Sequence, residues 1–263
     1  MKITIFTGSS NRHNFLINSL LDYDLYIISE KKKSFSYLKS KFYKKSFIEK
    51  NYFKKVFKSE KKIFGNSKLN EKNLKKIKKI NYKEINNINI NQLKSFLNSD
   101  LYIIFGSSFI KGDLVNFLVK KRAINIHLGI SPYYRGSNCN FWASVDKNFN
   151  LVGATIHLIN KEIDEGKILY HSFTEYIKNP IDYSMASVKG AILSLKEKIN
   201  DGSIFKIKGT KQNRKLLIRF SKNSNLSEDV FKKYPKKVIF KKRNKKLFIN
   251  PVMLRKNEIY VIN

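Results

Sequence analysis

The first thirty residues follow an order that few folds accommodate: a strand, a turn of small polar residues, a helix and a second strand. Residues 3–6 form a short apolar run, and residues 7–11 are small and mostly polar. Apolar residues then recur at helical spacing over 15–21, before a second apolar run at 25–28. Parallel strands need a crossover of this kind, so the pattern predicts an α/β fold with a Rossmann-like, mostly parallel sheet flanked by helices. The turn lacks the full glycine fingerprint of dinucleotide-binding proteins and predicts no nicotinamide site.

Further predicted elements divide the chain unevenly. Apolar patterning indicates strands at 101–105, 123–126, 152–159 and 168–170, and helices around 114–118 and 186–199. The lysine-rich stretch from 30 to 100 is typical of amphipathic helices with solvated lysine faces. After residue 205 the chain consists of short basic pieces with β-like runs. We therefore predict a main domain at 1–205 and a small, basic, β-rich C-terminal appendix at 206–263.

A formal net charge of +33 suggests an anionic partner. Of the 53 basic residues, however, only seven are Arg, and the Lys are spread along the chain among many Asn and Ile. Lys, Asn and Ile all have A/T-rich codons, so genome base composition alone produces such an excess. The arginine forks that read bases are scarce. Nucleic acid therefore stays open as a partner without being favoured, whereas the charge is expected to steer phosphate-bearing substrates toward the protein.

Several features limit where the protein acts. No apolar run approaches the roughly 20 residues that span a bilayer. No secretory signal pattern follows Met1, so we expect a cytoplasmic protein with no membrane partner. The single cysteine, Cys139, excludes an intramolecular disulfide and a cysteine-rich zinc site, and no metal is predicted. Nothing in the sequence predicts the oligomeric state.

One set of motifs is typical of a reactive site. Residues 125–136 read Asn-Ile-His-Leu-Gly-Ile-Ser-Pro-Tyr-Tyr-Arg-Gly, residues 153–155 read Gly-Ala-Thr, and residues 164–166 read Asp-Glu-Gly. Asn125 and His127 stand two residues apart at the end of a predicted strand, so their side chains project from the same face. Ligands of parallel sheets bind at such carboxyl ends. Taken singly, Asn125 as a turn residue, His127 as a satisfied strand-end histidine and Asp164 as a loop carboxylate are ordinary structural interpretations.

Together, these pieces resemble the folate-dependent formyltransferase family. The family includes glycinamide ribonucleotide formyltransferase, methionyl-tRNA formyltransferase and the sugar N-formyltransferases. The resemblance rests on Asn-x-His, a proline-containing loop, Gly-x-Thr and a distant Asp-x-Gly in that order. It covers about residues 1–200 and is strongest from 101 to 171. It implies a formyltransferase fold with 1–205 as the catalytic domain, and 10-formyltetrahydrofolate as co-substrate with no metal.

The resemblance implies that Asn125, His127 and Asp164 are catalytic, and their chemistry suits formyl transfer. Transfer to an amine passes through a tetrahedral intermediate that carries an oxyanion. Asn125 would donate an amide N–H to that oxygen. His127 would take a proton from the attacking amine or give one to the leaving folate nitrogen. Asp164 would orient His127 or stabilise its charge.

The resemblance also implies where the ligands lie. The pterin ring would enter a pocket formed by the loop after Phe105 and the segment around 163–166. The implied folate-binding residues are Gly106, Ser108, Phe109, Ile110, Ile163, Glu165 and Gly166. The acceptor would lie toward residues 8–12 and 133–138, with Arg12 and Arg135 holding its phosphate or carboxylate. The implied acceptor-binding residues are Gly8, Ser10, Asn11, Arg12 and Arg135.

The motifs do not select the amine acceptor. Tyr134-Arg135-Gly136 resembles the methionyl-tRNA and sugar enzymes more than the purine enzyme, and only 58 residues follow position 205, few for a tRNA-binding domain. We therefore favour a small phosphorylated or nucleotide-linked amine, an amino sugar first and glycinamide ribonucleotide second. A methionyl-tRNA formyltransferase-like enzyme is the third acceptor choice. Two other classes stay open: a formyl-folate hydrolase with water as acceptor, and a basic nucleic-acid-binding protein on an inactive scaffold.

Overall fold

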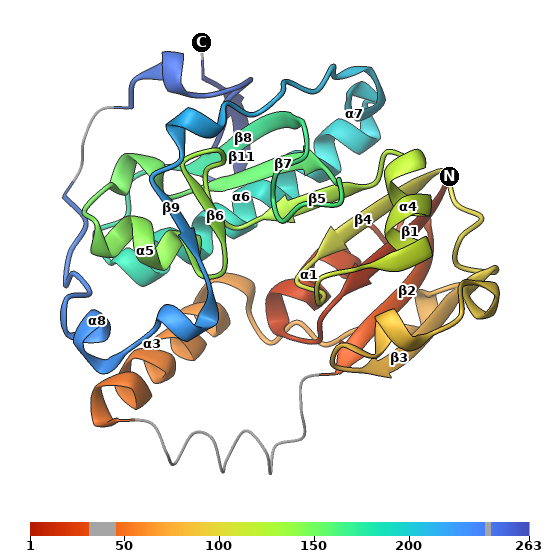
Figure 1. Cartoon of the computed structure of the whole chain (residues 1–263), viewed down its shortest axis with the longest axis horizontal. Coiled ribbons are helices and arrows are strands. Elements are labelled where there is room, and N and C mark those ends of the chain that lie inside the picture. Colours follow the sequence, from red (N-terminus) through yellow and green to blue (C-terminus); the bar gives the residue numbers. More distant parts are fainter. Residues whose placement is uncertain (32–45, 240–242, 263) are drawn as a thin grey trace.

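The computed structural model describes residues 1–31, 46–239 and 243–262, and in these residues nine strands form one large sheet (Figure 1). Its strands are β1 (Lys2–Thr7), β2 (Asp24–Lys31), β3 (Lys76–Asn81), β4 (Leu101–Phe105), β5 (Ile124–His127), β7 (Ala154–Leu158), β8 (Ile168–Thr174), β10 (Val252–Arg255) and β11 (Glu258–Val261). The helices are α1 (Asn11–Ser19), α3 (Phe47–Phe64), α4 (Gly112–Lys120), α5 (Cys139–Val145), α6 (Pro180–Asn200), α7 (Ser203–Lys206) and α8 (Glu228–Lys232). A small second sheet pairs β6 (Tyr134–Gly136) with β9 (Arg219–Ser221).

The large sheet has the order β11-β10-β8-β7-β5-β4-β1-β2-β3. Its five strands from β3 to β5 are parallel to one another. Strand β7 runs antiparallel to both β5 and β8, β10 runs parallel to β8, and β11 is antiparallel to β10. The prediction of a mostly parallel α/β sheet flanked by helices is therefore confirmed.

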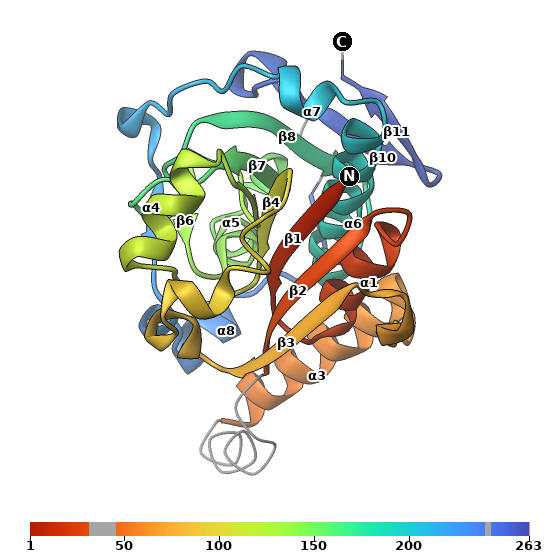
Figure 2. The same cartoon turned by 90° about the vertical axis from the view of Figure 1, so that its right-hand side faces the viewer.

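The alternation of side chains along the central strands builds two cores. On one face, Ile3 and Ile5 of β1 pack with apolar residues of α1, α3 and α6. On the other face, Phe6 and the β4 residue Ile104 pack with α4. Figure 2 shows α1, α3 and α6 on one side of the strands and α4 on the other. Because successive side chains of a strand point to opposite faces, a strand buried on both faces is expected to be apolar along nearly its whole length, as β4 is.

The described residues of 206–262 pack against the rest of the molecule in several places. Strand β10 continues the large sheet beyond β8, and β9 pairs in parallel with β6. A third apolar cluster joins α5 to α8 through Phe141 and Phe231. The division at 205/206 stays a prediction, but the C-terminal residues are integral to the sheet.

The prediction of helices throughout 30–100 is wrong for part of that stretch. Within this stretch, residues 32–45 lie outside the described part, and α3 is the only α-helix among the residues that are described. Lys76–Asn81 forms the edge strand β3. Lysine-rich composition also suits an edge strand, because the Lys side chains remain in water and discourage pairing with another chain. Ile80 supplies the buried contact of this strand.

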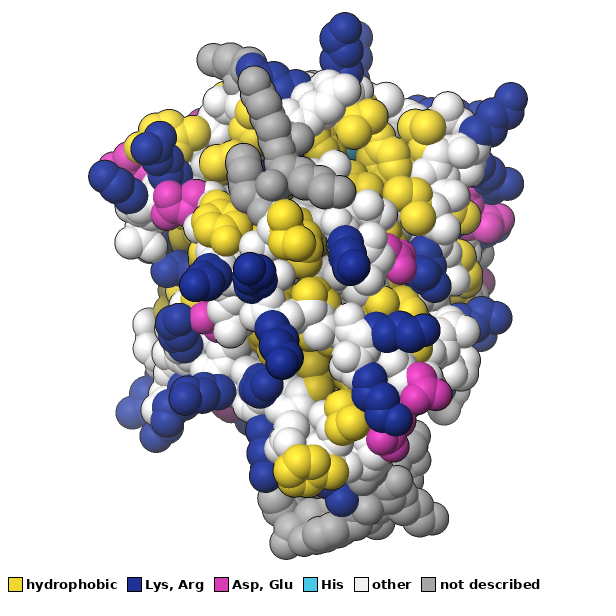
Figure 3. All heavy atoms as spheres, turned by 90° about the vertical axis from the view of Figure 1, so that its left-hand side faces the viewer, with side chains coloured by type: hydrophobic (Ala, Val, Ile, Leu, Met, Phe, Trp, Pro, Cys, Tyr) yellow, Lys and Arg dark blue, Asp and Glu magenta, His cyan; other side chains and the backbone are white. Residues whose placement is uncertain are grey.

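The positive charge is dispersed on the face that Figure 3 shows, where Lys and Arg are interspersed with apolar and uncharged side chains. This dispersion does not single out a basic patch on that face.

Among the helices in the described part of the chain, none combines the length and the apolar character that crossing a membrane requires.

Candidate active site

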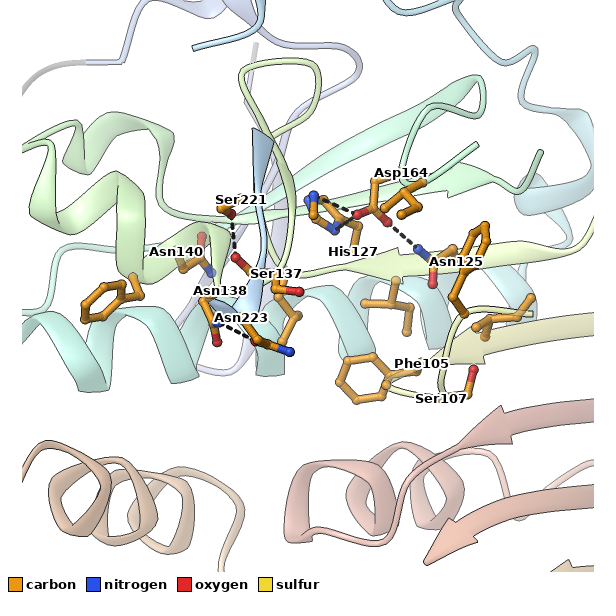
Figure 4. Close-up of a pocket in the computed structure, with 18 of the residues that line it drawn as sticks. Phe105, Ser107, Asn125, His127, Ser137, Asn138, Asn140, Asp164, Ser221 and Asn223 are labelled. Atoms are coloured by element: carbon orange, nitrogen blue, oxygen red, sulfur yellow. Dashed lines mark hydrogen bonds and ion pairs between the residues drawn. The ribbon is translucent and has the colours of Figure 1, made fainter. Parts of the chain in front are cut away.

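A cavity of about 770 Å³ opens at the carboxyl ends of β4 and β5. One end is lined by the loop after β4 and by the segment that leads to Asp164, and the other by α3, the first turn of α5 and the residues after β9. Asn125, His127 and Asp164 line the cavity between these ends (Figure 4). The fold therefore brings together, in one concave site, the three residues that the sequence motifs predict to be catalytic.

The three side chains form a connected cluster. The His127 Nδ1 atom lies 3.3 Å from Asp164 Oδ2, and the Asn125 amide donates to Asp164 Oδ1 at 3.3 Å. His127 Nε2 lies 3.1 Å from the main-chain oxygen of Tyr134. Both ring nitrogens of His127 thus face oxygen acceptors, an arrangement that only the doubly protonated imidazolium satisfies.

The electrostatics of the pair agree with this protonation. Burial lowers the pKa of His127, but the facing charge of Asp164, with a contribution from the Cys139 thiol, outweighs burial and holds that pKa well above its ordinary value. Burial raises the pKa of Asp164, yet the charge of His127 and the hydrogen bond from its ring leave that pKa well below its ordinary value. The cluster is therefore an ion pair in a site where His127 is only 6% exposed.

His157 orients the Asn125 amide. The His157 Nδ1 atom lies 2.8 Å from the Leu158 carbonyl oxygen, so Nδ1 carries the proton and Nε2 accepts. The Asn125 amide nitrogen donates to that Nε2 at 3.0 Å as well as to Asp164. An oxyanion that accepts from Asn125 therefore has to replace one of these two contacts, and the longer one, to Asp164, is the weaker.

The loop that carries Asp164 is held in an unusual backbone conformation. Asp164 has a positive φ of 53°, a region that favours Gly, Asn and Asp. The Gln212 amide donates to the carbonyl oxygens of Asp164 and Gly166 at 2.9 and 2.8 Å, and the Gly136 N–H donates to Asp164 Oδ2 at 3.0 Å. A Cβ atom at Gly166 would overlap the Leu158 carbonyl oxygen, which explains the glycine of the Asp-x-Gly motif.

The Gly-x-Thr motif supports the loop after His127. The Thr155 hydroxyl donates to the Gly129 carbonyl oxygen at 2.6 Å and accepts from the Ser131 N–H at 2.8 Å. A Cβ atom at Gly153 would lie 2.6 Å from Ile130 Cδ1, so the glycine allows the close approach. Thr155 therefore shapes the site without reaching the cavity.

The residues implied as folate-binding fall into two groups. Gly106, Ser108, Phe109, Ile110 and Ile163 line the cavity. Ser108 is fixed by the buried Glu30 carboxylate, which accepts from its N–H and its hydroxyl at 2.8 and 2.5 Å. Glu165 and Gly166 lie outside the cavity lining, and Glu165 instead pairs with Arg135 and Arg214.

Of the residues implied as acceptor-binding, Arg12 lines the cavity, where it pairs with Glu60. Gly8, Ser10, Asn11 and Arg135 are absent from its lining. Gly8 packs against the His13 ring, and Ser10 contacts His13 Nδ1. Arg135 donates to the Ile163 carbonyl oxygen and to Glu165, and thereby braces the loop of Asp164.

Several lining residues were not predicted from the sequence. They belong to α3, to the first turn of α5, to the end of β9 and to the residues that follow it: Tyr52, Phe53, Val56, Phe57, Glu60, Asn140, Phe141, Phe220, Ser221, Lys222, Asn223 and Tyr234. The aromatic residues of α3 recur at helical spacing, which is equally typical of an ordinary core face. No group of three or more His, Cys, Asp or Glu side chains in the described residues is arranged to hold a metal ion.

Comparison with solved structures gives the fold. A sugar N-formyltransferase from a Shewanella species is 16% identical with a TM-score of 0.56, over 100% of this chain and 96% of that one. Phosphoribosylglycinamide formyltransferase from Anaplasma phagocytophilum is 15% identical with a TM-score of 0.51, over 84% and 98%. A sugar 3N-formyltransferase solved in the presence of dTDP and 5-N-formyl-tetrahydrofolate is 17% identical with a TM-score of 0.50, over 86% and 71%. No curated protein matches the chain.

The sequence itself gives the family. The formyl transferase family model matches residues 26–197, which is more than half of the chain. The chain therefore belongs to the formyl transferase family. This confirms the family predicted from the motifs, and with it the class of enzyme, a formyltransferase.

Proposed function

We propose that the protein transfers the formyl group of 10-formyltetrahydrofolate to a primary amine of a nucleotide-linked amino sugar. The observation that carries the proposal is the Asn125–His127–Asp164 cluster midway along a cavity with two chemically different ends. The end formed by residues 104–110 and 159–164 takes the folate, and the end formed by α3, α5 and residues 220–223 takes the acceptor. That the protein acts in the cytoplasm is part of the same proposal.

The residues divide the transfer between them. The acceptor amine attacks the formyl carbon, and a C–N bond forms as the carbonyl oxygen gains negative charge. The Asn125 amide and the His127 imidazolium donate to this oxyanion. The bond from the formyl carbon to the folate nitrogen then breaks. The His127 imidazolium gives its proton to the leaving folate nitrogen, and the ring then takes one proton from the amine. Asp164 keeps the ring oriented and favours its return to the imidazolium form.

The acceptor end supports a nucleotide-linked sugar. Its walls include the aromatic side chains of Tyr52, Phe53 and Phe57, which suit a base or a sugar ring face. Lys222, which adjoins Asn223 at this end, and Arg12, whose partner Glu60 lies on α3, line the cavity and suit a diphosphate. Among the structural relatives, a sugar N-formyltransferase covers the whole of this chain. Glycinamide ribonucleotide remains the second candidate acceptor, because its enzyme shares the fold.

The test begins with folate binding. We expect 5-formyltetrahydrofolate, a stable analogue, to raise the melting temperature of the wild type in a saturable manner. The wild type is then mixed with 10-formyltetrahydrofolate and dTDP- or UDP-linked amino sugars, glycinamide ribonucleotide or charged initiator tRNA, and formamide products are identified by mass spectrometry. His127→Ala should lower turnover by about 10² or more while still binding the analogue.

Each result separates the alternatives. Formylation of a nucleotide-linked amino sugar alone supports the proposal, whereas formylation of glycinamide ribonucleotide alone replaces the acceptor. Release of formate without an acceptor would indicate a hydrolase. Binding of random oligonucleotides with a steep salt dependence, in the absence of any folate-induced stabilisation, would replace the enzyme with a nucleic-acid-binding protein.

A further inference from the structure

Two buried donors that line the cavity lack a partner in the described part of the chain. Ten buried side-chain nitrogen or oxygen atoms there make no hydrogen bond, and two belong to cavity-lining residues: Arg12 Nε and Asn140 Nδ2. Arg12 already pairs with Glu60 through its guanidinium. Asn140 is only 4% exposed, so its free amide N–H groups have little access to water. A buried donor left without an acceptor is destabilising and calls for an explanation.

The orientation of the Asn140 amide is fixed. Its Oδ1 atom accepts from the Gly153 N–H at 3.1 Å, and a main-chain nitrogen can only donate. The amide oxygen must therefore face Gly153, and the nitrogen must face the other way. The Gly153 backbone cannot shift easily, since it packs against Ile130 and Phe173. The NH₂ group of Asn140 is thus a preset donor.

The polar groups around Asn140 are mostly uncharged, although Lys222 lies between Ser221 and Asn223 in the same cavity wall. The Asn138 amide donates to Asn223 Oδ1 at 2.8 Å, and the Ser221 hydroxyl donates to the Ser137 carbonyl oxygen at 2.5 Å (Figure 4). This belt of Asn and Ser begins directly after Gly136, whose N–H contacts Asp164. An acceptor whose amine reaches His127 would lay its adjoining atoms along the belt. Amide and hydroxyl groups of this kind match the neutral oxygens of a sugar rather than a phosphate.

We propose that Asn140 is a specificity-determining residue whose Nδ2 atom donates a hydrogen bond to a hydroxyl oxygen of the acceptor's sugar ring. This inference rests on the proposed function and narrows it. It assigns the residues from Ser137 to Asn140, together with Asn223, to the sugar, and leaves Arg12 and Lys222 at the nucleotide diphosphate. The folate end of the cavity has no part in it.

The substitution Asn140→Asp tests the donor with little change of shape. One carboxylate oxygen still accepts from Gly153, while the other replaces the NH₂ group and repels a sugar oxygen. With a dTDP-linked amino-dideoxyhexose, we expect the acceptor KM to rise about 10- to 100-fold. The KM for 10-formyltetrahydrofolate should stay within twofold, and so should the Kd for dTDP, which lacks the sugar.

The matched control is Asn148→Asp. The Asn148 amide donates to the Tyr134 hydroxyl at 2.7 Å and lies outside the cavity lining. The same chemical change there removes a donor that has a protein partner, so it should lower the melting temperature and leave the acceptor KM within twofold. A measurement that needs no variant complements it. Acceptors that each lack one ring hydroxyl should include one analogue whose KM with the wild type is raised. For that analogue, Asn140→Asp should raise the KM no further.

The outcomes separate the two levels of the proposal. Suppose that the wild type formylates the sugar. The role of Asn140 is then overturned if Asn140→Asp leaves the acceptor KM unchanged, or if the variant loses as much affinity for dTDP alone. Additive losses for Asn140→Asp and every deoxy analogue overturn it as well. If the wild type formylates no nucleotide-linked amino sugar, the proposed function fails and this inference fails with it.

Discussion

Substitution of Asp164 by Asn is the perturbation that most directly tests the ion pair at the centre of the site. Asn has nearly the same shape, and its single amide oxygen can still accept from the Gly136 N–H, whereas its NH₂ group cannot accept from Asn125 as the second carboxylate oxygen does. The substitution also removes the negative charge that lies 3.3 Å from His127 Nδ1. We therefore expect Asp164→Asn to fold, and to lower the pKa of His127.

The size of the effect follows from Coulomb's law. Opposite unit charges at 3.3 Å interact by about 5 kcal/mol at an effective dielectric constant of about 20. Because a tenfold change in a protonation equilibrium corresponds to about 1.4 kcal/mol, loss of an interaction of this size should lower the pKa of His127 markedly. Burial of the imidazole then acts without that opposing charge, and the pKa should fall below the ordinary value near 6.5. Near neutral pH the ring would become neutral, and turnover should drop by about 10² or more.

The assay is a proton NMR titration of the imidazole resonances. The chain has four histidines, and His127→Gln identifies the signal of His127. Glu165→Gln is the matched control, because its carboxylate lies one residue further along the loop and pairs with arginines instead of His127. A His127 pKa that is the same within about half a unit in wild type and Asp164→Asn would refute the electrostatic account of the pair.

Three further predictions concern the same cluster. Asn125→Ala should lower kcat by roughly 10² to 10³ if its amide stabilises the oxyanion, and a near-normal steady-state rate would remove it from that role. The raised pKa of His127 contributes stability that is full below about pH 6.5 and lost as pH rises through the folded-state value. The lowered pKa of Asp164 contributes stability that is full above about pH 4 and lost as pH falls through its folded-state value. Urea titrations of the wild type and of Asp164→Asn give the difference between their free energies of unfolding at each pH. This difference should be largest between about pH 4 and 6.5, and a difference that does not vary with pH would contradict the pairing. Gln212→Met removes the side-chain amide whose N–H groups donate to the Asp164 loop, and it should lower kcat roughly tenfold with little change in the KM for the folate. A lower melting temperature with an unchanged kcat would make Gln212 purely structural.

The triad was predictable because its signals are local. Asn125 and His127 share a face by strand periodicity alone, and the glycines of the motifs are explained by close backbone contacts at Gly153 and Gly166. The parallel pairing of β1 with β2 likewise follows from the strand–helix–strand pattern at the start of the chain. These features need no knowledge of distant parts of the chain.

The walls of the cavity were not predictable in the same way. Phe57 and Asn223 are far apart in sequence and meet the same cavity only because α3 and the segment after β9 pack beside α5. Gly8, in contrast, has a local sequence that suggests a binding role, but the structure places it outside the cavity lining. Its position after β1 resembles a phosphate loop, but the His13 ring fills the space against Gly8 and Gly106. Only side-chain packing, which leaves no local pattern, distinguishes a phosphate cradle from a packed turn.

The geometry of the proposed catalytic cluster depends on residues that follow position 205. Tyr134 and Gly136 contact His127 and Asp164 through their main chains, and both belong to β6, which is held in place by pairing with β9. Gln212 fixes the Asp164 loop from the same C-terminal segment. Both sides of the ion pair are thus braced by a stretch whose composition predicts only a basic appendix. The distance between His127 and Asp164, on which the pKa of the imidazole depends, is in this sense set by the C-terminal residues.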